Sequence, residues 1–357
     1  PLEPRYAGLD LLRTLCTHAL PDLRSASRPI IRRLAQADTI RGQQLVRTLI
    51  SVLEQAETSE GVHAHVLRTL REDLGKTLSD LSRDDALRLC RSPSQLAVEL
   101  GGHLLHSHPA WADDLPTVEI VALAHAEVKG VRDAACLYLS RVAPRLHADP
   151  TALGEAARIL ESKWDDAREY GFRMLRDEFG EKDFTPDLLI AICDSVRPDV
   201  QALGRELITR HFSGSDGVTY LLRLSEHPST DLQLFATNYL ERFAVDDVAR
   251  LASLRAYFVS VLSRVNQARL AKRRVYEFLL AEACKSREAA LLISDILARV
   301  SATIAIGDRA RAIEAMLEIG RRFPDVPLPV SLPQPPLRNG AVGAGGKAGK
   351  KEARGAV

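Results

Sequence analysis

The sequence predicts an all-α protein, a right-handed α-solenoid of stacked antiparallel helix pairs with a C-terminal helical cap. The first observation is composition, because Leu, Ala and Arg are abundant and only 5% of residues are aromatic. The second is a helical hairpin pattern that recurs roughly every 32 to 36 residues. The third is the placement of prolines near the starts of several expected helices. Neither helix of such a hairpin can bury its apolar stripe alone, so neighbouring hairpins should stack.

The repeat consists of an apolar anchor, a small residue four positions later and an aliphatic residue eight positions later. Val200, Gly204 and Ile208 show it within residues 194–212, where Pro198 suits the first helical turn. Glycine in a helix costs about 1 kcal/mol relative to alanine, so we expect a close approach between repeats at Gly204. The same offsets recur at Ala97, Gly101, Leu105; Val131, Ala135, Leu139; Ala167, Gly171, Leu175; and Leu232, Ala236, Leu240.

Four regions follow along the chain. Residues 1–90 indicate degenerate N-terminal helical repeats, with weak copies near Ile30 and Val62. Residues 91–245 hold the regular repeats, in which each anchor helix follows another apolar-periodic segment: 116–128, 150–163, 185–195 and 216–226.

The C-terminal part loses this period. Residues 246–322 keep helical patterns and should form capping helices, at about 246–265, 268–285, 287–302 and 308–322. Residues 323–357 are proline-rich and then rich in Gly, Ala and Lys, and we expect them to be disordered.

The starts of the second helices resemble the HEAT-repeat superfamily of α-solenoids. In that family an aliphatic residue, a basic or amide residue and then a small residue often open the second helix. The matching stretches here begin Val131-Arg132, Ala167-Arg168, Val200-Gln201 and Leu232-Gln233. The resemblance covers residues 90–245 well and the N-terminal part weakly.

Other repeat families fit less well. The period is shorter than the roughly 40 to 47 residues of HEAT repeats and suits tetratricopeptide repeats better, but the tetratricopeptide signature is absent. Residues 164–322 also look like repeat segments of large bacterial proteins that carry a WGR domain, although no WGR motif is present. The resemblance implies a scaffold that binds proteins, nucleic acid or both.

The bulk properties indicate a soluble, cytoplasmic protein. No apolar run approaches the roughly 20 residues needed to cross a bilayer, so we expect no membrane association. Five widely separated cysteines, each in an apolar helical pattern, suggest buried thiols in a reducing compartment. The chain begins with Pro, which is compatible with a piece of a longer parent protein.

Charge is unevenly distributed although the net charge is only +1. Residues 1–50 are basic, residues 149–199 contain thirteen acidic and seven basic residues, and residues 264–274 contain five basic residues and no acidic one. A protein with this balance is not a globally basic nucleic-acid binder, but local patches could attract charged partners.

The candidate binding residues come from the basic segments: Arg264, Arg269, Lys272, Arg273, Arg28 and Arg32. On a helix, Arg269, Lys272 and Arg273 share a face and could point together at an anion. Asn266 and Gln267 could cap that helix or bind a phosphate. Three interpretations stay open: a solvated helix face, a site for an acidic protein surface, and a nucleic-acid contact.

Signals for chemistry are weak. His103, His106 and His108 have a spacing that metal ligands can use, but ordinary histidines at a helix end explain it better. Trp164 beside Asp165 superficially resembles the damaged-base site of HEAT-like DNA glycosylases, yet its acidic surroundings favour a packing role. No phosphate loop, serine elbow or HExxH motif is present, so we predict no catalytic residues, cofactor or metal.

We therefore predict a non-enzymatic scaffold that mediates protein–protein or interdomain interaction, with a protein or another domain of a longer parent chain as partner. The alternative is a nucleic-acid-binding module that uses the basic helix faces.

Overall fold

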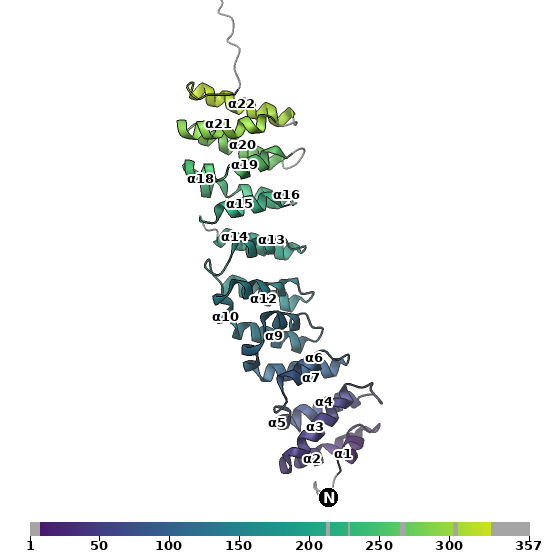
Figure 1. Ribbon diagram of the computed structural model, residues 1–357. Coiled ribbons are helices and arrows are strands. Elements are labelled where there is room, and N and C mark those ends of the chain that lie inside the picture. Colours follow the sequence, from purple (N-terminus) through teal and green to yellow (C-terminus); the bar gives the residue numbers. More distant parts are fainter. Residues whose placement is uncertain (1–7, 212–214, 228, 265–268, 303–305, 330–357) are drawn as a thin grey trace, which may run out of the picture. The chain divides into compact units, whose positions relative to one another are not determined.

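The structure is a computed structural model that describes residues 8–211, 215–227, 229–264, 269–302 and 306–329. Every regular element in these ranges is helical, so the predicted all-α class is confirmed. The chain divides into two compact units, Pro1–Phe235 and Ala236–Val357, and each is described by itself (Figure 1).

The N-terminal unit starts with helices that pack on their neighbours in sequence. They are α1 (Leu9–Cys16), α2 (Pro21–Ala37), α3 (Thr39–Leu53), α4 (Val62–Glu72) and the short α5 (Gly75–Leu78). Pro29 lies inside α2, so prolines do not mark helix ends throughout the chain.

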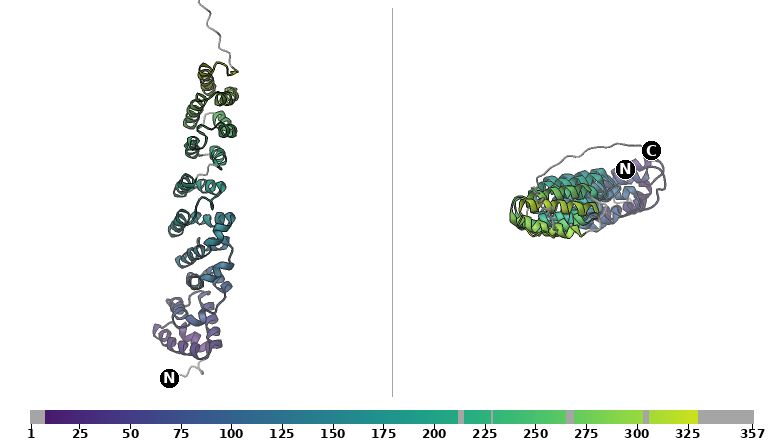
Figure 2. Two further views of the ribbon diagram at one scale, coloured as in Figure 1. Left: turned by 90° about the vertical axis from the view of Figure 1, so that its left-hand side faces the viewer. Right: turned by 90° about the horizontal axis from the view of Figure 1, so that it is seen from above.

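Helix pairs joined by short turns follow, and the two members of a pair pack against one another in α6 with α7, α8 with α9, η3 with α12, and α13 with α14. The elements are α6 (Arg83–Cys90), α7 (Gln95–Ser107), η2 (Pro109–Asp114), α8 (Thr117–Leu123), α9 (Lys129–Arg141), α10 (Ala143–Ala148), α11 (Pro150–Ala157), η3 (Arg158–Glu161), α12 (Asp165–Asp177), α13 (Pro186–Cys193), α14 (Pro198–His211), α15 (Gly217–Glu226) and α16 (Thr230–Thr237). Successive pairs touch through α7 and α9, through α8 and α11, and through α13 and α15. In two perpendicular views the helices of residues 83–211 follow one another in chain order (Figures 1 and 2).

Local sequence sets where several of these helices start. Pro150 and Pro186 occupy first-turn positions, where a missing N–H costs nothing, and Asp149 and Thr185 accept backbone N–H bonds as N-caps. Ser82 forms a reciprocal capping box with Asp85 at the start of α6. The starts of α11 and α13 agree with the segments 150–163 and 185–195 expected from the sequence.

A long polar side chain, buried in Arg24, Arg132, Arg168 and Gln233 and half-buried in Gln201, recurs at the start of five second helices. In each case it follows the anchor residue and donates to the backbone carbonyl six residues earlier, in the turn between the two helices. The bonds run from Arg24 to His18, Arg132 to Ala126, Arg168 to Ser162, Gln201 to Ser195 and Gln233 to His227. The carbonyls of the turn, which lack helical partners, are thereby satisfied.

Arg132 and Arg168 also reach the next pair. The Arg132 guanidinium lies 2.8 Å from Asp166, at the start of α12, and the Arg168 guanidinium lies 3.4 Å from Asp199, at the start of α14. Each of these arginines therefore ties its own turn to the beginning of the following second helix.

Arg24 identifies the first repeat. By these offsets the anchor position is Leu23, which is exposed, unlike the buried anchors Val131, Ala167 and Val200; the buried Ser27 and Ile31 follow at the small and aliphatic offsets of the later copies. The weak copy expected near Ile30 therefore starts seven residues earlier.

The small residues of the repeat lie where helices meet closely. A Cβ added to Gly204 would lie 2.7 Å from the Cys193 backbone nitrogen, and one added to Gly171 would lie 2.6 Å from Ile159. Both neighbours belong to the first helical segment of the same pair, so the expectation of a contact between repeats at Gly204 is wrong. Ala135 and Ala236, at the equivalent position, are fully buried.

The five cysteines are unpaired in the structure, and Cys16 and Cys193 are buried. Burial raises the pKa of both the Cys90 and the Cys193 thiols to about 12. Among the helices that the structure describes, none is long and apolar enough to cross a bilayer.

The C-terminal unit contains helices of its own that pack around α21. They are α17 (Leu240–Ala244), α18 (Val248–Ser253), α19 (Arg255–Ser263), α20 (Arg269–Ala283), α21 (Arg287–Ser301) and α22 (Ile306–Arg322). Residues 323–329 were expected to be part of a disordered tail, and this stays a prediction; in the structure Val326 is buried and Asp325 lies 2.6 Å from Arg287. The rest of the tail, 330–357, lies outside the described residues, and the predicted boundaries at 90, 245 and 322 stay predictions.

Two glycine substitutions test the repeat geometry. We expect Gly204→Ala to destabilise the protein by about 1–3 kcal/mol, because the new methyl group meets the Cys193 backbone. Gly154→Ala is the matched control: its Cβ would meet nothing within 4 Å, so it should be neutral or stabilise by up to about 1 kcal/mol. Urea unfolding measures both, and equal unfolding midpoints for the two variants would contradict the assigned contact.

The Arg132–Asp166 ion pair predicts a pH dependence. Burial acts to raise the pKa of Asp166, but hydrogen bonds from Arg132 and Ala167 and the charge of Arg132 hold it below its usual value. A lowered pKa in the folded state contributes stability above pH 4 or so, and this stability is lost as pH falls through the folded-state pKa.

Arg132→Gln should remove this contribution while keeping the bond to the Ala126 carbonyl, as Gln201 and Gln233 do in their own turns. We expect a loss of about 1.5–3 kcal/mol at pH 7 that shrinks toward pH 3. A difference in unfolding free energy that stays constant from pH 7 to pH 3 would exclude this role for the pair.

Candidate functional site

The N-terminal basic candidates are held in ion pairs. Arg28 Nε lies 2.5 Å from Asp73, Arg28 also contacts Glu72, and Arg32 contacts Asp73 as well. The Asp73 side chain is fully buried, so it neutralises much of the positive charge of the two arginines. The hydrogen bond that Arg28 donates to Asp73 is also the largest cause of the raised pKa of Arg28. These arginines therefore hold α2 to the end of α4.

Lys272 does not lie on an outward face with Arg269 and Arg273, and that prediction is wrong. Its side chain is buried, its ammonium lies 2.5 Å from Asp308 of α22, and it donates to the carbonyl of Arg264. Arg269 and Arg273 are exposed, and Arg273 lies 3.7 Å from Glu277. Three cations converging on one anion are therefore absent from the described part of this helix; Asn266 and Gln267 lie outside the described residues.

The histidine and tryptophan candidates have structural contacts. His108 stacks on Trp111 with ring centroids 4.3 Å apart, and its Nδ1 lies 2.9 Å from the Leu104 carbonyl. Trp164 lies under the guanidinium of Arg132, 4.3 Å from the ring centroid. Over the ranges that the structure describes, no three His, Cys, Asp or Glu side chains come together as metal ligands could.

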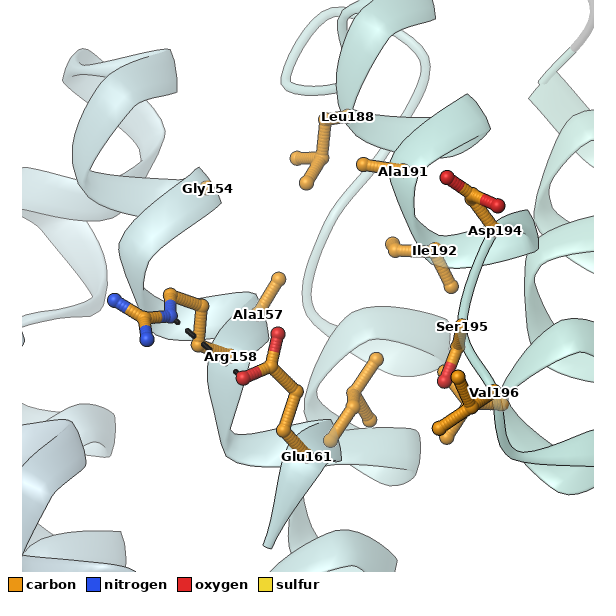
Figure 3. A pocket seen from close by; sticks show the side chains of 12 residues that line it. Gly154, Ala157, Arg158, Glu161, Leu188, Ala191, Ile192, Asp194, Ser195 and Val196 are labelled. Atoms are coloured by element: carbon orange, nitrogen blue, oxygen red, sulfur yellow. Dashed lines mark ion pairs between the residues drawn. The ribbon is translucent and has the colours of Figure 1, made fainter.

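An apolar groove lies between α11 and α13. It consists of two hollows of about 360 and 500 Å³ that share Gly154, Arg158, Leu188 and Ala191. One wall comes from α11 and η3, and the other comes from α13 and the turn that follows it. Figure 3 shows the two walls facing one another, with the Arg158 and Glu161 side chains on the α11 side and Leu188 and Ala191 across from them.

The groove surface is made of small and aliphatic side chains. Gly154, Ala157 and Ala191 have small side chains or none, so they fill little of the groove. Ile192 and Val200 also line it and are buried. Val196, in the turn after α13, is 96% exposed. Val196 therefore lies in solvent beside the groove and is not part of the packed core.

On the side of their second helices, the two pairs that flank the groove are joined by polar contacts. There, Arg168 contacts Asp199, Arg176 lies 2.8 Å from Glu206, and Arg210 donates to the Arg176 carbonyl at 2.9 Å. The first helices α8 and α11 pack together, as do α13 and α15, whereas α11 and α13 leave the groove between them. Polar contacts therefore connect the second helices of the two pairs, and the groove lies between their first helices.

The segment between α12 and α13 is held in place by aromatic and histidine side chains. Phe179 and Phe184 are buried, and their rings neighbour His147 and His211 at 4.5 and 5.1 Å respectively. His147 Nδ1 lies 2.8 Å from Asp183. Burial acts to raise the pKa of Asp183, but the Gly180 N–H and His147 lower it overall. The α12–α13 connection is thus anchored at both ends.

The groove is bordered by more negative than positive charge. Its charged lining residues are Glu155, Arg158, Glu161 and Asp194, and Arg158 lies 3.8 Å from Glu161. Asp194 also lies 2.7 Å from His227. This border belongs to the acid-rich segment 149–199 noticed in the sequence. A surface of this kind can bury an apolar side chain and attract a cation, and it repels phosphates.

Comparisons with known proteins do not assign the chain to a family. No family model matches the chain, and no curated protein matches it. Among solved structures, a crystal structure of an engineered protein from the Northeast Structural Genomics Consortium is similar at 14% sequence identity, over 88% of this chain and 89% of that chain. The TM-score of that superposition is 0.31, which does not indicate a shared fold.

Sequence reasoning did not predict the groove. Two features of the sequence lie at the groove: Gly154 in the middle of an apolar helical pattern, and the aliphatic Val196 in a turn. In the structure, a Cβ added to Gly154 would meet nothing within 4 Å, and Val196 is exposed. Neither signal locates a groove alone, because the separation of α11 and α13 depends on contacts made elsewhere in the two pairs.

Proposed function

We propose that this chain is a non-enzymatic scaffold whose N-terminal unit is a right-handed, HEAT-like α-solenoid that binds a segment of a protein partner, or of another domain of a longer parent chain. The proposed binding site is the groove between α11 and α13, and the proposed setting is the cytoplasm. The C-terminal cap stays a prediction for residues 246–322.

The observation that carries this proposal is the open apolar surface between two helix pairs that are otherwise bridged. Helix-rich proteins usually fill such a space with side chains, because interiors pack densely. Here the walls carry Gly154 and Ala191 instead of large residues, and Val196 is left in solvent. Burying this surface against a partner would recover the hydrophobic free energy, at about 25 cal/mol per Å² of apolar area.

Protein binding is favoured over nucleic-acid binding by the charges. Arg28, Arg32 and Lys272 are neutralised by Asp73, Glu72 and Asp308. The groove itself is bordered by carboxylates, which oppose a phosphate backbone.

Site-specific photocrosslinking tests the proposal. A benzophenone amino acid placed at Val196 should crosslink to a specific protein partner in native lysate, whereas the same group at Glu169, exposed on α12, should not. Gly154→Phe should abolish the Val196 crosslink by filling the groove.

The matched control is Gly130→Phe. Gly130 is also half-buried in a helix and has open space at its Cβ, but it does not line the groove. Crosslinks that persist in Gly154→Phe, or a chain that instead binds DNA with a steep salt dependence in gel shifts, would refute the proposed function.

A further inference from the structure

We infer that the groove between α11 and α13 binds a short amphipathic helix that carries large aliphatic residues on one face and Lys or Arg beside them. This inference rests on the proposed function and names the chemistry of the partner segment.

The backbone of the groove walls favours a helical occupant over an extended one. Apart from the turn that contains Ser195 and Val196, the walls are helices, whose backbone groups are mostly bonded within each helix. An extended peptide would find no strand edge to pair with, and its N–H and C=O groups would lie unbonded against the apolar walls. A helix satisfies its own backbone, so it can lie between α11 and α13 without that cost.

The dimensions favour a short helix with large anchors. α13 has 8 residues, so it is about 12 Å long, or roughly two turns. A helix lying along it would present two or three anchors at i, i+3 or i+4, and i+7. Gly154, Ala157 and Ala191 project little into the space, so Leu, Ile or Met on the partner would fill it.

The charge of the border favours a cationic partner. Glu155 and Glu161 lie on the α11 side and Asp194 on the α13 side, against the one guanidinium of Arg158. Arg158 and Glu161 are both exposed and are 3.8 Å apart, so a partner Lys or Arg can share the Glu161 carboxylate. Charges at such a rim mainly select the partner and speed its association, while the apolar anchors supply most of the affinity.

The test is selection from a displayed library of random 16-residue peptides against the full chain, with counter-selection against Gly154→Phe. We expect enriched sequences with Leu, Ile or Met at helical spacing, enrichment in Lys and Arg, and depletion of Asp and Glu. A synthetic consensus peptide should then become helical on binding, as measured by circular dichroism.

Charge-reversal variants complete the test with that consensus peptide. Glu155→Lys and Glu161→Lys should each weaken binding about fivefold, and more at low salt, as expected for exposed charge pairs. Glu169→Lys, an acidic residue of the same segment outside the groove, should leave affinity unchanged, and a peptide with Glu in place of its Lys and Arg should not bind.

The outcomes separate the inference from the proposed function. Enriched apolar peptides without a preference for Lys or Arg, or peptides that bind in extended form, would overturn the inference and leave groove binding standing. Enrichment that is unaffected by Gly154→Phe, or no enrichment at all, would overturn both.

Discussion

One hydrogen bond recurs through the N-terminal unit: at five second helices, the residue after the anchor donates it to the carbonyl six positions earlier. A turn between two packed helices exposes carbonyls that have no helical partner, and leaving them unbonded in a buried place is costly. Arg24, Arg132, Arg168, Gln201 and Gln233 solve the same problem in their respective turns. The anchor Ala97 is followed by Val98, which has no side-chain donor. Because an arginine has donors to spare, Arg132 and Arg168 can also bind the first turn of the next second helix. Arg132 pairs in this way with Asp166, and Arg168 with Asp199. Glutamine, at positions 201 and 233, has no positive charge with which to form such an ion pair.

The groove follows from the way in which one junction is held. Two ion pairs connect α12 with α14. The Arg168 side chain, which contacts Asp199, is buried, whereas Arg176 and Glu206 are exposed, where a single ion pair contributes little. The contact between the first helices α11 and α13 is smaller than the one that α8 makes with α11. This junction therefore combines polar bridges between the second helices with a groove between the first helices.

Much of the fold was predictable from the sequence, because helices are governed by local patterns. The period, the helix starts at Pro150 and Pro186 and the burial of Ala135 and Gly171 follow from spacing and from backbone chemistry. The candidate site was not predictable in the same way. Exposed basic residues seemed the best candidates, but a run of bases carries no information about acids that are distant in sequence. Asp73 lies 45 residues from Arg28, and Asp308 lies 36 from Lys272.

The sequence by itself determined an all-helical chain, its repeat and the basic or amide residue that opens four of the second helices, at Arg132, Arg168, Gln201 and Gln233, since these follow from local patterns. Only the tertiary structure decided which charges are neutralised and which apolar faces meet. Gly204 shows the difference: its place in the helix indicated a close neighbour, but only the packing identified that neighbour as Cys193 of its own pair. The groove is likewise a property of two pairs together, because whether Leu188 and Ala191 are covered depends on the distance between helices that local sequence does not encode.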